Sequence, residues 1–356
     1  MGDRGMISSI KSSGARLVAA MAGVAALTFA GPGHALTVTP TFDSSITSSP
    51  NAAAIEAAIN QVTQTYRMFS NPAKVSIDFQ LGNLGGPGGE SLSTRYATAY
   101  TDYEFAALAH DAATHPWNHV LATAQANLAS GNTADFIVST SANFRALGYI
   151  GADGVLGSDG GPDGTFDGIV LLDAASVQAD LYAFTPTVGP AQESGLNVLY
   201  HEVDEVLGIG GAGSFLNDVA NGADFNAIGP LDPYRYDLST GLKSYTTDPN
   251  IISYFSIDGG VTPIAPFNQI NPPGFFGDFG DWGRFACNDG LHSIQEWAGC
   301  SGEPSLPFTS TGWESTALQS IGYNMVPEPG IWTLMILGLG GTGLGMRRRR
   351  LGGRLI

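Results

Sequence analysis

The sequence predicts an α+β domain between residues 36 and 325, and three observations support this fold class. Helices with an apolar stripe are interspersed with scattered short strands, a mixture that favours an α+β domain over a β-sandwich. Val75-Ser76-Ile77-Asp78-Phe79 alternates apolar and polar side chains, as a strand with one buried face does. The stretch 195–207 repeats its apolar residues at helical spacing, with Ser194 as the expected N-cap and Gly208 at its end.

Several elements are expected before this helix. Residues 51–69 have apolar side chains at helical spacing, and Asn71 and Pro72 end the predicted helix. The glycine-rich stretch 82–89 lacks the Lys-Ser/Thr ending of a phosphate-binding loop, so we interpret it as a flexible connection. Further helices are expected at 103–113, 117–129 and 141–147, and further strands at 136–138 and 169–172.

The part of the domain after the helix at 195–207 is less regular. Residues 230–281 are rich in proline, glycine, asparagine and aromatic side chains. Within them, Tyr254-Phe255-Ser256-Ile257 predicts a strand, and Asp258-Gly259-Gly260 is a hairpin signal. Residues 313–321 predict a last helix that closes the domain.

Residues 1–35 have the three parts of a secretion signal. Lys11 and Arg16 precede an apolar run at 17–30, and Gly31-Pro32 breaks that run. Gly33-His34-Ala35 then places small residues at the −3 and −1 positions of a cleavage site. We therefore expect a cleaved signal peptide over 1–35 and an exported protein. The alternative is an N-terminal membrane anchor, although the apolar run is short for a permanent span.

The other end of the chain, residues 326–356, also has three parts in order. The stiff motif Pro327, Glu328 and Pro329 comes first, an uncharged apolar stretch at 331–346 follows, and Arg347-Arg348-Arg349-Arg350 ends it. A short apolar helix followed by arginines is expected to lie in the inner membrane as a transmembrane helix with its basic end in the cytoplasm. An ordinary single-pass tail anchor is the alternative interpretation.

This tail resembles the PEP-CTERM sorting signal of Gram-negative bacteria, in which an exosortase-type protease cuts near the Pro-Glu-Pro motif. The resemblance implies an exosortase-type processing enzyme as a partner and the inner membrane as a transient location. It further implies that the processed domain resides in the cell envelope or the extracellular matrix.

The domain between the two ends is strongly acidic. Residues 36–325 keep seven lysine and arginine residues against thirty aspartate and glutamate residues, whereas the whole chain has 15 and 32. Such a surface repels the phosphates of nucleic acids, so nucleic-acid binding is excluded as a function. The same charge favours solubility and cation binding.

The chain has two cysteines, Cys287 and Cys300, and both follow the predicted signal peptide. In an oxidising compartment, a pair this close in sequence more often forms a disulfide than a metal site or a catalytic nucleophile. We therefore predict a disulfide between them.

The clearest catalytic pattern is His201-Glu202-Val203-Asp204-Glu205. His201 and Glu205 are four residues apart on a helix and share one face, whereas Glu202 points to a flank of that face. In zinc peptidases, the pattern H-E-x-x-H provides two metal-binding histidines and a glutamate that polarises the metal-bound water. Here the second ligand position is a glutamate, and a carboxylate also binds zinc.

From about residue 51 to residue 323, the chain resembles zincin-like metallopeptidase-type proteins that often carry PEP-CTERM tails. The resemblance implies a small mixed sheet and a central active-site helix. On this helix we expect zinc bound by His201 and Glu205, with Glu202 as the general base. We further expect Tyr236 or Tyr254 to assist at the oxyanion. The motifs of the chain stand in the family's order: His201-Glu202-Val203-Asp204-Glu205-Val206-Leu207-Gly208, Tyr234-Arg235-Tyr236, Tyr254-Phe255-Ser256-Ile257-Asp258-Gly259-Gly260, Gly280-Asp281-Trp282 and Ala317-Leu318-Gln319-Ser320-Ile321-Gly322-Tyr323.

We therefore expect a zinc-dependent endopeptidase that hydrolyses peptide or protein substrates through metal-activated water. The alternative is a non-catalytic matrix or adhesion protein on the same scaffold. The sequence departs from the metzincin pattern because Gly211 stands where a third ligand is usual, and no methionine follows the helix closely. A third ligand is expected further along the chain, with four candidates that the sequence does not rank: Asp218, Asp224, Asp232 and Asp237.

Two other groups suggest metal binding less strongly. Asp153, Asp159, Asp163 and Asp167 alternate with glycines and suit calcium, but their spacing differs from an EF-hand and fits a series of Asp-Gly turns. His110, His115 and His119 do not share one helical face because Pro116 separates them, so we interpret them as surface histidines.

Overall fold

The computed structural model of the chain describes residues 35–128, 134–148, 166–220, 222, 226–269, 277–283, 287 and 293–326. All but the last residue of the predicted signal peptide lies outside these ranges, and so does the predicted sorting tail from Pro327 onward. Within the described ranges, no helix combines the length and the apolar character that a membrane crossing requires.

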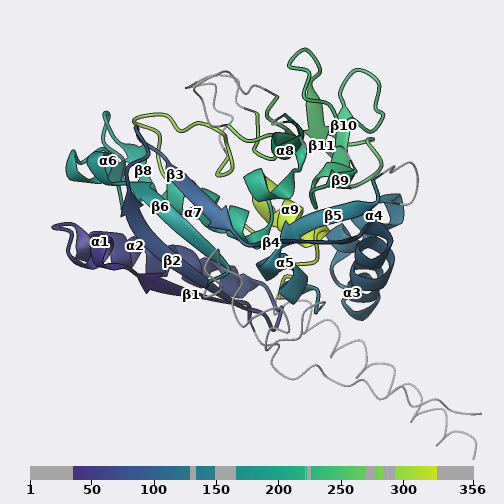
Figure 1. The fold of residues 1–356 in the computed structure, drawn as a ribbon, viewed down its shortest axis with the longest axis horizontal. Helices are drawn as coiled ribbons and strands as arrows, with labels where there is room; N and C mark the ends of the chain where they lie inside the picture. The colour runs from purple at the N-terminus through teal and green to yellow at the C-terminus, as the bar shows by residue number, and fades with distance from the viewer. Residues whose placement is uncertain are drawn as a thin grey trace, which may run out of the picture. The chain divides into compact units, whose positions relative to one another are not determined.

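The largest sheet has four strands in the order β1-β2-β6-β3 (Figure 1). Strands β1 (Thr37–Phe42), β2 (Lys74–Gly82) and β6 (Gly168–Asp173) are parallel, and β3 (Gly89–Ser93) is the antiparallel edge strand. The strand predicted at 75–79 is confirmed, and Val75, Ile77 and Phe79 are almost completely buried. Asp78 on the opposite face is buried as well. Helix α7 (Gly195–Leu207) packs against β3 and against α2 (Ala52–Thr65), so it is central to the domain.

Three smaller sheets complete the strands of the described chain. Figure 1 shows β5, β9, β10 and β11 grouped away from the four-stranded sheet. These sheets consist of β4 (Arg95–Ala99), β5 (Phe136–Thr140) and β9 (Ala227–Ile228); of β10 (Arg235–Asp237), β11 (Ser253–Phe255) and β12 (Ala265–Pro266); and of β7 (Tyr182–Ala183) and β8 (Glu193–Ser194).

The remaining helices are mostly short. They are α1 (Ser44–Thr47), η1 (Tyr66–Met68), the π-helix η2 (Asp102–Leu108), α3 (Ala109–Thr114), α4 (His119–Leu128), α5 (Ser141–Ala146), α6 (Ala174–Gln178), η3 (Gly210–Gly213), α8 (Leu216–Ala220), η4 (Asp232–Tyr234) and α9 (Trp313–Ser320). The mixture of helices with small mixed sheets confirms the α+β class.

The two ends of the described domain meet at one short segment. Leu36 N donates a hydrogen bond to Phe69 O at 2.8 Å, and Val326 N donates to Met68 O at 2.7 Å. The point where the predicted sorting tail begins is therefore anchored beside the first strand.

Asp111 of α3 connects this helix to the C-terminal end of the domain. Its Oδ1 lies 2.8 Å from His115 Nδ1, and its Oδ2 accepts a hydrogen bond from Asn324 Nδ2 at 2.8 Å. The hydrogen bond to Asp111 raises the pKa of His115, although partial burial opposes the charged imidazole. His115 therefore pairs with Asp111 within the domain, which is a structural role and not that of a metal ligand.

Replacement of His115 by glutamine is expected to lower the free energy of unfolding more at pH 6 than at pH 9. A histidine whose pKa rises on folding stabilises the folded state fully below its unfolded pKa of about 6.5, and that contribution is lost as the pH passes the folded value. Urea unfolding at both pH values measures the difference, with the exposed His119→Gln as the control. Equal losses at both pH values would contradict the ion pair.

Candidate metal centre

Helix α7 forms as its sequence predicts. Ser194 Oγ accepts a hydrogen bond from Asn197 N at 3.1 Å and so caps the N-terminus. Gly208 ends the helix in the left-handed region, with a φ of 108°. Residues with a side chain rarely adopt this conformation. The predicted apolar stripe is fully buried: Leu199, Val203, Val206 and Leu207. Because both ends and the buried face are fixed, the polar face of α7 is held in place.

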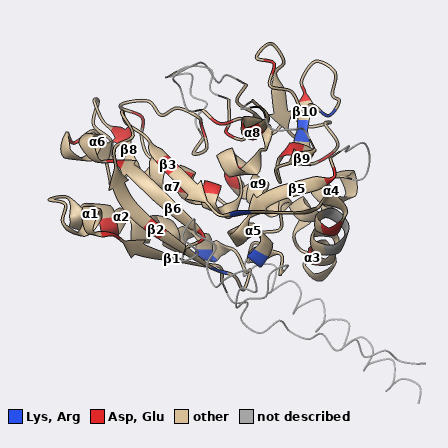
Figure 2. Cartoon of the chain, viewed as in Figure 1, with Lys and Arg blue, Asp and Glu red and all other residues tan. Residues whose placement is uncertain are grey.

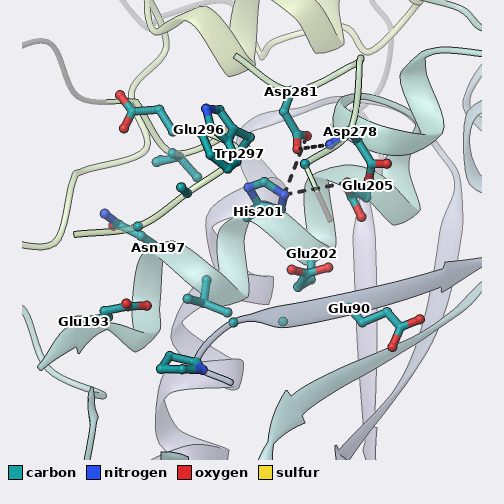
Figure 3. Close-up of a pocket in the computed structure, with 18 of the residues that line it drawn as sticks. Glu90, Glu193, Asn197, His201, Glu202, Glu205, Asp278, Asp281, Glu296 and Trp297 are labelled. Carbon is teal, nitrogen blue, oxygen red and sulfur yellow. Dashed lines mark hydrogen bonds and ion pairs between the residues drawn. The ribbon is translucent and has the colours of Figure 1, made fainter. Parts of the chain in front are cut away.

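Three side chains from two distant parts of the chain meet on this polar face (Figure 3). His201 Nε2 lies 3.6 Å from Glu205 Oε1 and 3.6 Å from Asp281 Oδ1. The three ligand atoms all lie within 4.8 Å of one another. Asp281 comes from the loop that follows β12, so tertiary packing brings it to the helix.

The spacing fits a single metal ion. Two ligands of a tetrahedral zinc ion, each about 2.1 Å from the metal, lie about 3.4 Å apart. His201 Nε2 is 3.6 Å from each carboxylate oxygen, so small shifts would bring all three atoms to bonding distance. The donor set of one imidazole and two carboxylates consists of groups that bind zinc.

Glu205 is held by two donors. Gly211 N donates to its Oε1 at 2.7 Å, and Ser91 Oγ of the edge strand β3 donates to its Oε2 at 2.6 Å. Burial raises the pKa of a carboxyl group, but His201 and these donors outweigh it and lower the pKa of Glu205. Glu205 is therefore an oriented, ionised carboxylate.

Asp281 is oriented by a separate pair of donors. Gln295 Nε2 donates to its Oδ1 at 3.2 Å, and Asp278 N donates to its Oδ2 at 3.2 Å. Burial raises the pKa of Asp281 to about 7, even though His201 opposes the shift. The carboxylate that faces His201 is thus buried and fixed in orientation.

Two further carboxyl groups lie beside the three ligand atoms. Burial, followed by the charge of Glu205, raises the pKa of Asp278 to about 9 and the pKa of Glu202 well above its usual value. Burial disfavours the imidazolium form of His201, but Asp281 and Glu205 outweigh it and raise its pKa. Several buried carboxylates around one imidazole require a compensating cation, and protons or a metal ion can provide it.

Glu202 occupies the flank between α7 and β3. Glu202 is only 4 % exposed. If Gly89 had a Cβ atom, that atom would lie 2.5 Å from Glu202 Oε1. A side chain at Gly89 would therefore displace Glu202. Figure 3 shows the Glu202 carboxylate below His201, towards the strand.

These groups line a large cleft of about 1560 Å³. One side of the cleft is the segment 83–91, which includes the start of β3, and the floor is α7. The loops that contain Asp278, Asp281 and Trp297 form the other side. Neither Tyr236 nor Tyr254 is among its described lining residues, and the expected role of these tyrosines at the oxyanion stays a prediction.

The sequence did not identify Asp281 as a candidate ligand. Of its own candidates, Asp218 pairs with Arg95 at 3.2 Å, and Asp237 is a turn residue whose Oδ1 accepts from Ser239 N. The Asp232 carboxylate is bound by Ser214, Phe215 and Gly229, and Asp224 lies outside the described residues. The available signal was the motif Gly280-Asp281-Trp282, which contains the aspartate.

The predicted disulfide between Cys287 and Cys300 is confirmed, with the two Cα atoms 6.0 Å apart. It closes a loop that contains Gln295, the donor to Asp281. Glu303 lies near both sulfur atoms, but a disulfide has no thiolate to bind a metal.

Loss of this disulfide is expected to lower the free energy of unfolding by about 2–3 kcal/mol, because the bond restricts the unfolded chain over a short loop. Chemical unfolding of the Cys287→Ser, Cys300→Ser double variant, compared with the oxidised wild type, measures the change. A reduced wild type should match the double variant. Equal stability of the oxidised and reduced forms would contradict a stabilising role.

The calcium hypothesis falls mostly on undescribed residues. Asp153, Asp159 and Asp163 lie outside the described ranges. Asp167 is completely buried and forms an ion pair with Arg145. Within the described chain, two groups of side chains could hold a metal ion. One includes the disulfide-bonded cysteines, and the other consists of His201, Glu205 and Asp281.

Comparisons of the chain with protein-family models, with curated proteins and with solved structures found no match. The site geometry therefore carries the functional argument.

Proposed function

We propose that this protein is a zinc-dependent endopeptidase with a zincin-like active-site helix. The observation that carries the proposal is the convergence of His201, Glu205 and Asp281, whose ligand atoms lie within 4.8 Å of one another at the floor of a cleft. A bare H-E-x-x-E pattern occurs by chance in many helices. A third oriented ligand from a distant loop is a much more specific feature.

His201, Glu205 and Asp281 would hold the zinc ion. When bound, zinc supplies a Lewis acid that activates water and polarises the carbonyl group of a peptide bond. The hydrogen bonds from Gly211, Ser91 and Gln295 keep the two carboxylates oriented towards the ion. Such supporting hydrogen bonds commonly tune the affinity of a metal site.

Glu202 would act as the general base. Its carboxyl group borders the cleft but is not one of the three clustered ligand groups, so it is available for proton transfer. Burial, followed by the charge of Glu205, raises the pKa of Glu202 above that of an ordinary glutamate. The proton of the attacking water would pass to the Glu202 carboxylate and then to the leaving amine.

An extended peptide substrate would bind along β3. This strand is the edge of the four-stranded sheet, and its beginning lines the cleft beside Glu202. The free edge of a strand offers backbone N–H and C=O groups that can pair with an extended peptide. A scissile bond held there would lie next to the metal ligands of α7.

Export and tail processing remain part of the proposal. A disulfide between Cys287 and Cys300 is typical of proteins that fold outside the cytoplasm and agrees with the predicted signal peptide. The protease would then act in the cell envelope or the extracellular matrix.

The purified protein tests the proposal through its metal content and its activity. We expect about one zinc ion per chain after dialysis, hydrolysis of casein, loss of hydrolysis with a chelator, and recovery when zinc is added back. A protein without stoichiometric metal, or with hydrolysis that a chelator does not affect, would refute the peptidase function. A protein with neither bound zinc nor hydrolysis of casein would favour the alternative of a non-catalytic matrix protein.

A further inference from the structure

The turn that contains Asp278 and Asp281 is held by hydrogen bonds from other elements. Asn217 of α8 accepts from Phe279 N at 2.9 Å, and its Nδ2 donates to the Asp278 carboxylate. Asn268 contributes its backbone N–H to Asp281 O at 2.7 Å and its Nδ2 to Asp278 O at 3.1 Å. The position of Asp281 therefore depends on residues that are remote from it in sequence.

Arg235 of β10 also contacts this turn. Its side chain is completely buried, and its Nη2 donates to the carbonyl oxygen of Phe279. Its guanidinium carbon lies 3.9 Å above the ring of Phe267, a cation–π contact. Figure 2 shows how few lysine and arginine residues the described chain has, and β10 is one of the elements that carries one.

The ion pair with Asp232 does not explain why this arginine is buried. The Arg235 Nε to Asp232 Oδ1 distance is 3.8 Å, too long for a hydrogen bond. Three closer groups donate hydrogen bonds to the Asp232 carboxylate: Ser214 Oγ at 2.7 Å, Gly229 N at 2.8 Å and Phe215 N at 2.9 Å. Among the residues that the structure describes, Arg235 Nε and Nη1 have no hydrogen-bond partner.

A buried cation with two unpartnered nitrogen atoms is costly for the fold. Burial lowers the pKa of Arg235 to about 10, so the guanidinium keeps its charge at neutral pH. Within the described part of the chain, the hydrogen bond of this guanidinium goes to Phe279, in the middle of the turn that contains Asp281. Removal of a merely stabilising arginine would loosen the whole domain, whereas removal of this one should loosen the turn first.

We infer that Arg235 is a positioning residue for the metal centre. Its hydrogen bond to the Phe279 carbonyl holds the turn 278–281 and so keeps Asp281 opposite His201. This inference rests on the proposed function for its metal-binding consequence. The hydrogen bond between Arg235 and the Phe279 carbonyl, which we call the clamp, is present in the metal-free protein. Its effect on the turn can therefore be measured independently of metal binding.

Hydrogen exchange of the full-length, metal-free protein tests the clamp. We expect Arg235→Met to lose amide protection in the peptide that covers 277–283, while other parts of the domain keep theirs. Arg235→Lys retains the charge and can still donate to one carbonyl, so its protection should be intermediate. If Arg235→Met does not fold, the comparison of Arg235→Lys with the wild type decides.

Competition with a chelator measures the consequence for Zn²⁺ binding. Both Arg235 variants should bind Zn²⁺ more weakly, by about 10–100-fold for methionine, as is usual when a group that supports a ligand is removed. Arg145→Met is the matched control because Arg145 is also buried but contacts Asp167 and the Lys74 carbonyl. It should lower global stability and leave the Zn²⁺ affinity of the folded protein unchanged.

Unchanged exchange at 277–283 in the folded Arg235 variants would overturn the inference. The same holds for a loss of protection spread evenly over the domain, as a purely structural role predicts. If the wild type binds no Zn²⁺, the proposed function fails, while the exchange result still decides whether Arg235 holds the turn.

Discussion

Replacement of Glu202 by glutamine is expected to lower kcat for peptide hydrolysis by about 10²–10⁴-fold and to leave the bound zinc in place. Glutamine has nearly the same shape, so it fits the narrow space beside Gly89. It cannot accept the proton of the attacking water. Metal analysis and a casein assay on the same preparation separate the two effects.

The control for this variant is Glu90→Gln, the same chemical change in the same cleft. Glu90 is exposed on β3, and Figure 3 shows it away from the metal ligands. Its kcat should stay close to that of the wild type. Hydrolysis that survives in Glu202→Gln would assign the activity to another group or to a contaminating protease.

Replacement of Asp281 by alanine is expected to weaken zinc binding by more than about 100-fold and to abolish hydrolysis with it. The variant removes one of the three clustered donors, and His201 and Glu205 alone form an incomplete site. In the metal-free protein the same variant should not lose stability, because it removes a buried carboxyl group whose pKa is raised to about 7. Zinc titration and thermal unfolding in a chelator measure these two outcomes.

Asp218→Ala is the matched control for the third ligand. The sequence offered Asp218 as a candidate, but the structure pairs it with Arg95 at the surface. Zinc affinity should be unchanged in this variant. If Asp218→Ala loses zinc and Asp281→Ala retains it, the metal centre described here is wrong.

Much of the fold was predictable where the signal was local. The helix α7, its Ser194 cap and its end at Gly208 follow from spacing and capping within one short stretch. The strand β2 follows from its alternation. The edge strand β3 was missed, because Gly89-Glu90-Ser91-Leu92-Ser93 has little apolar content and follows a glycine-rich turn. Its identity as a strand depends on pairing with β6.

The candidate site divides in the same way. His201 and Glu205 were predicted to share a face because the period of a helix places residues four apart above one another. Asp281 carries no such relation to them, since its position comes from packing between loops and from donors such as Gln295. The role of Arg235 was equally hidden, because a sequence does not report which carbonyl a buried guanidinium contacts.

The sequence by itself determined the α+β class, the helix that carries His201 and Glu205 on one face, and the disulfide between Cys287 and Cys300. Each of these depends on short-range periodicity or on composition. The tertiary structure alone decided that Asp281 lies opposite His201, that Glu202 lies beside Gly89 of β3, and that Arg235 contacts the Phe279 carbonyl. These features join residues far apart in the chain, and their geometry depends on long-range packing that no local pattern encodes.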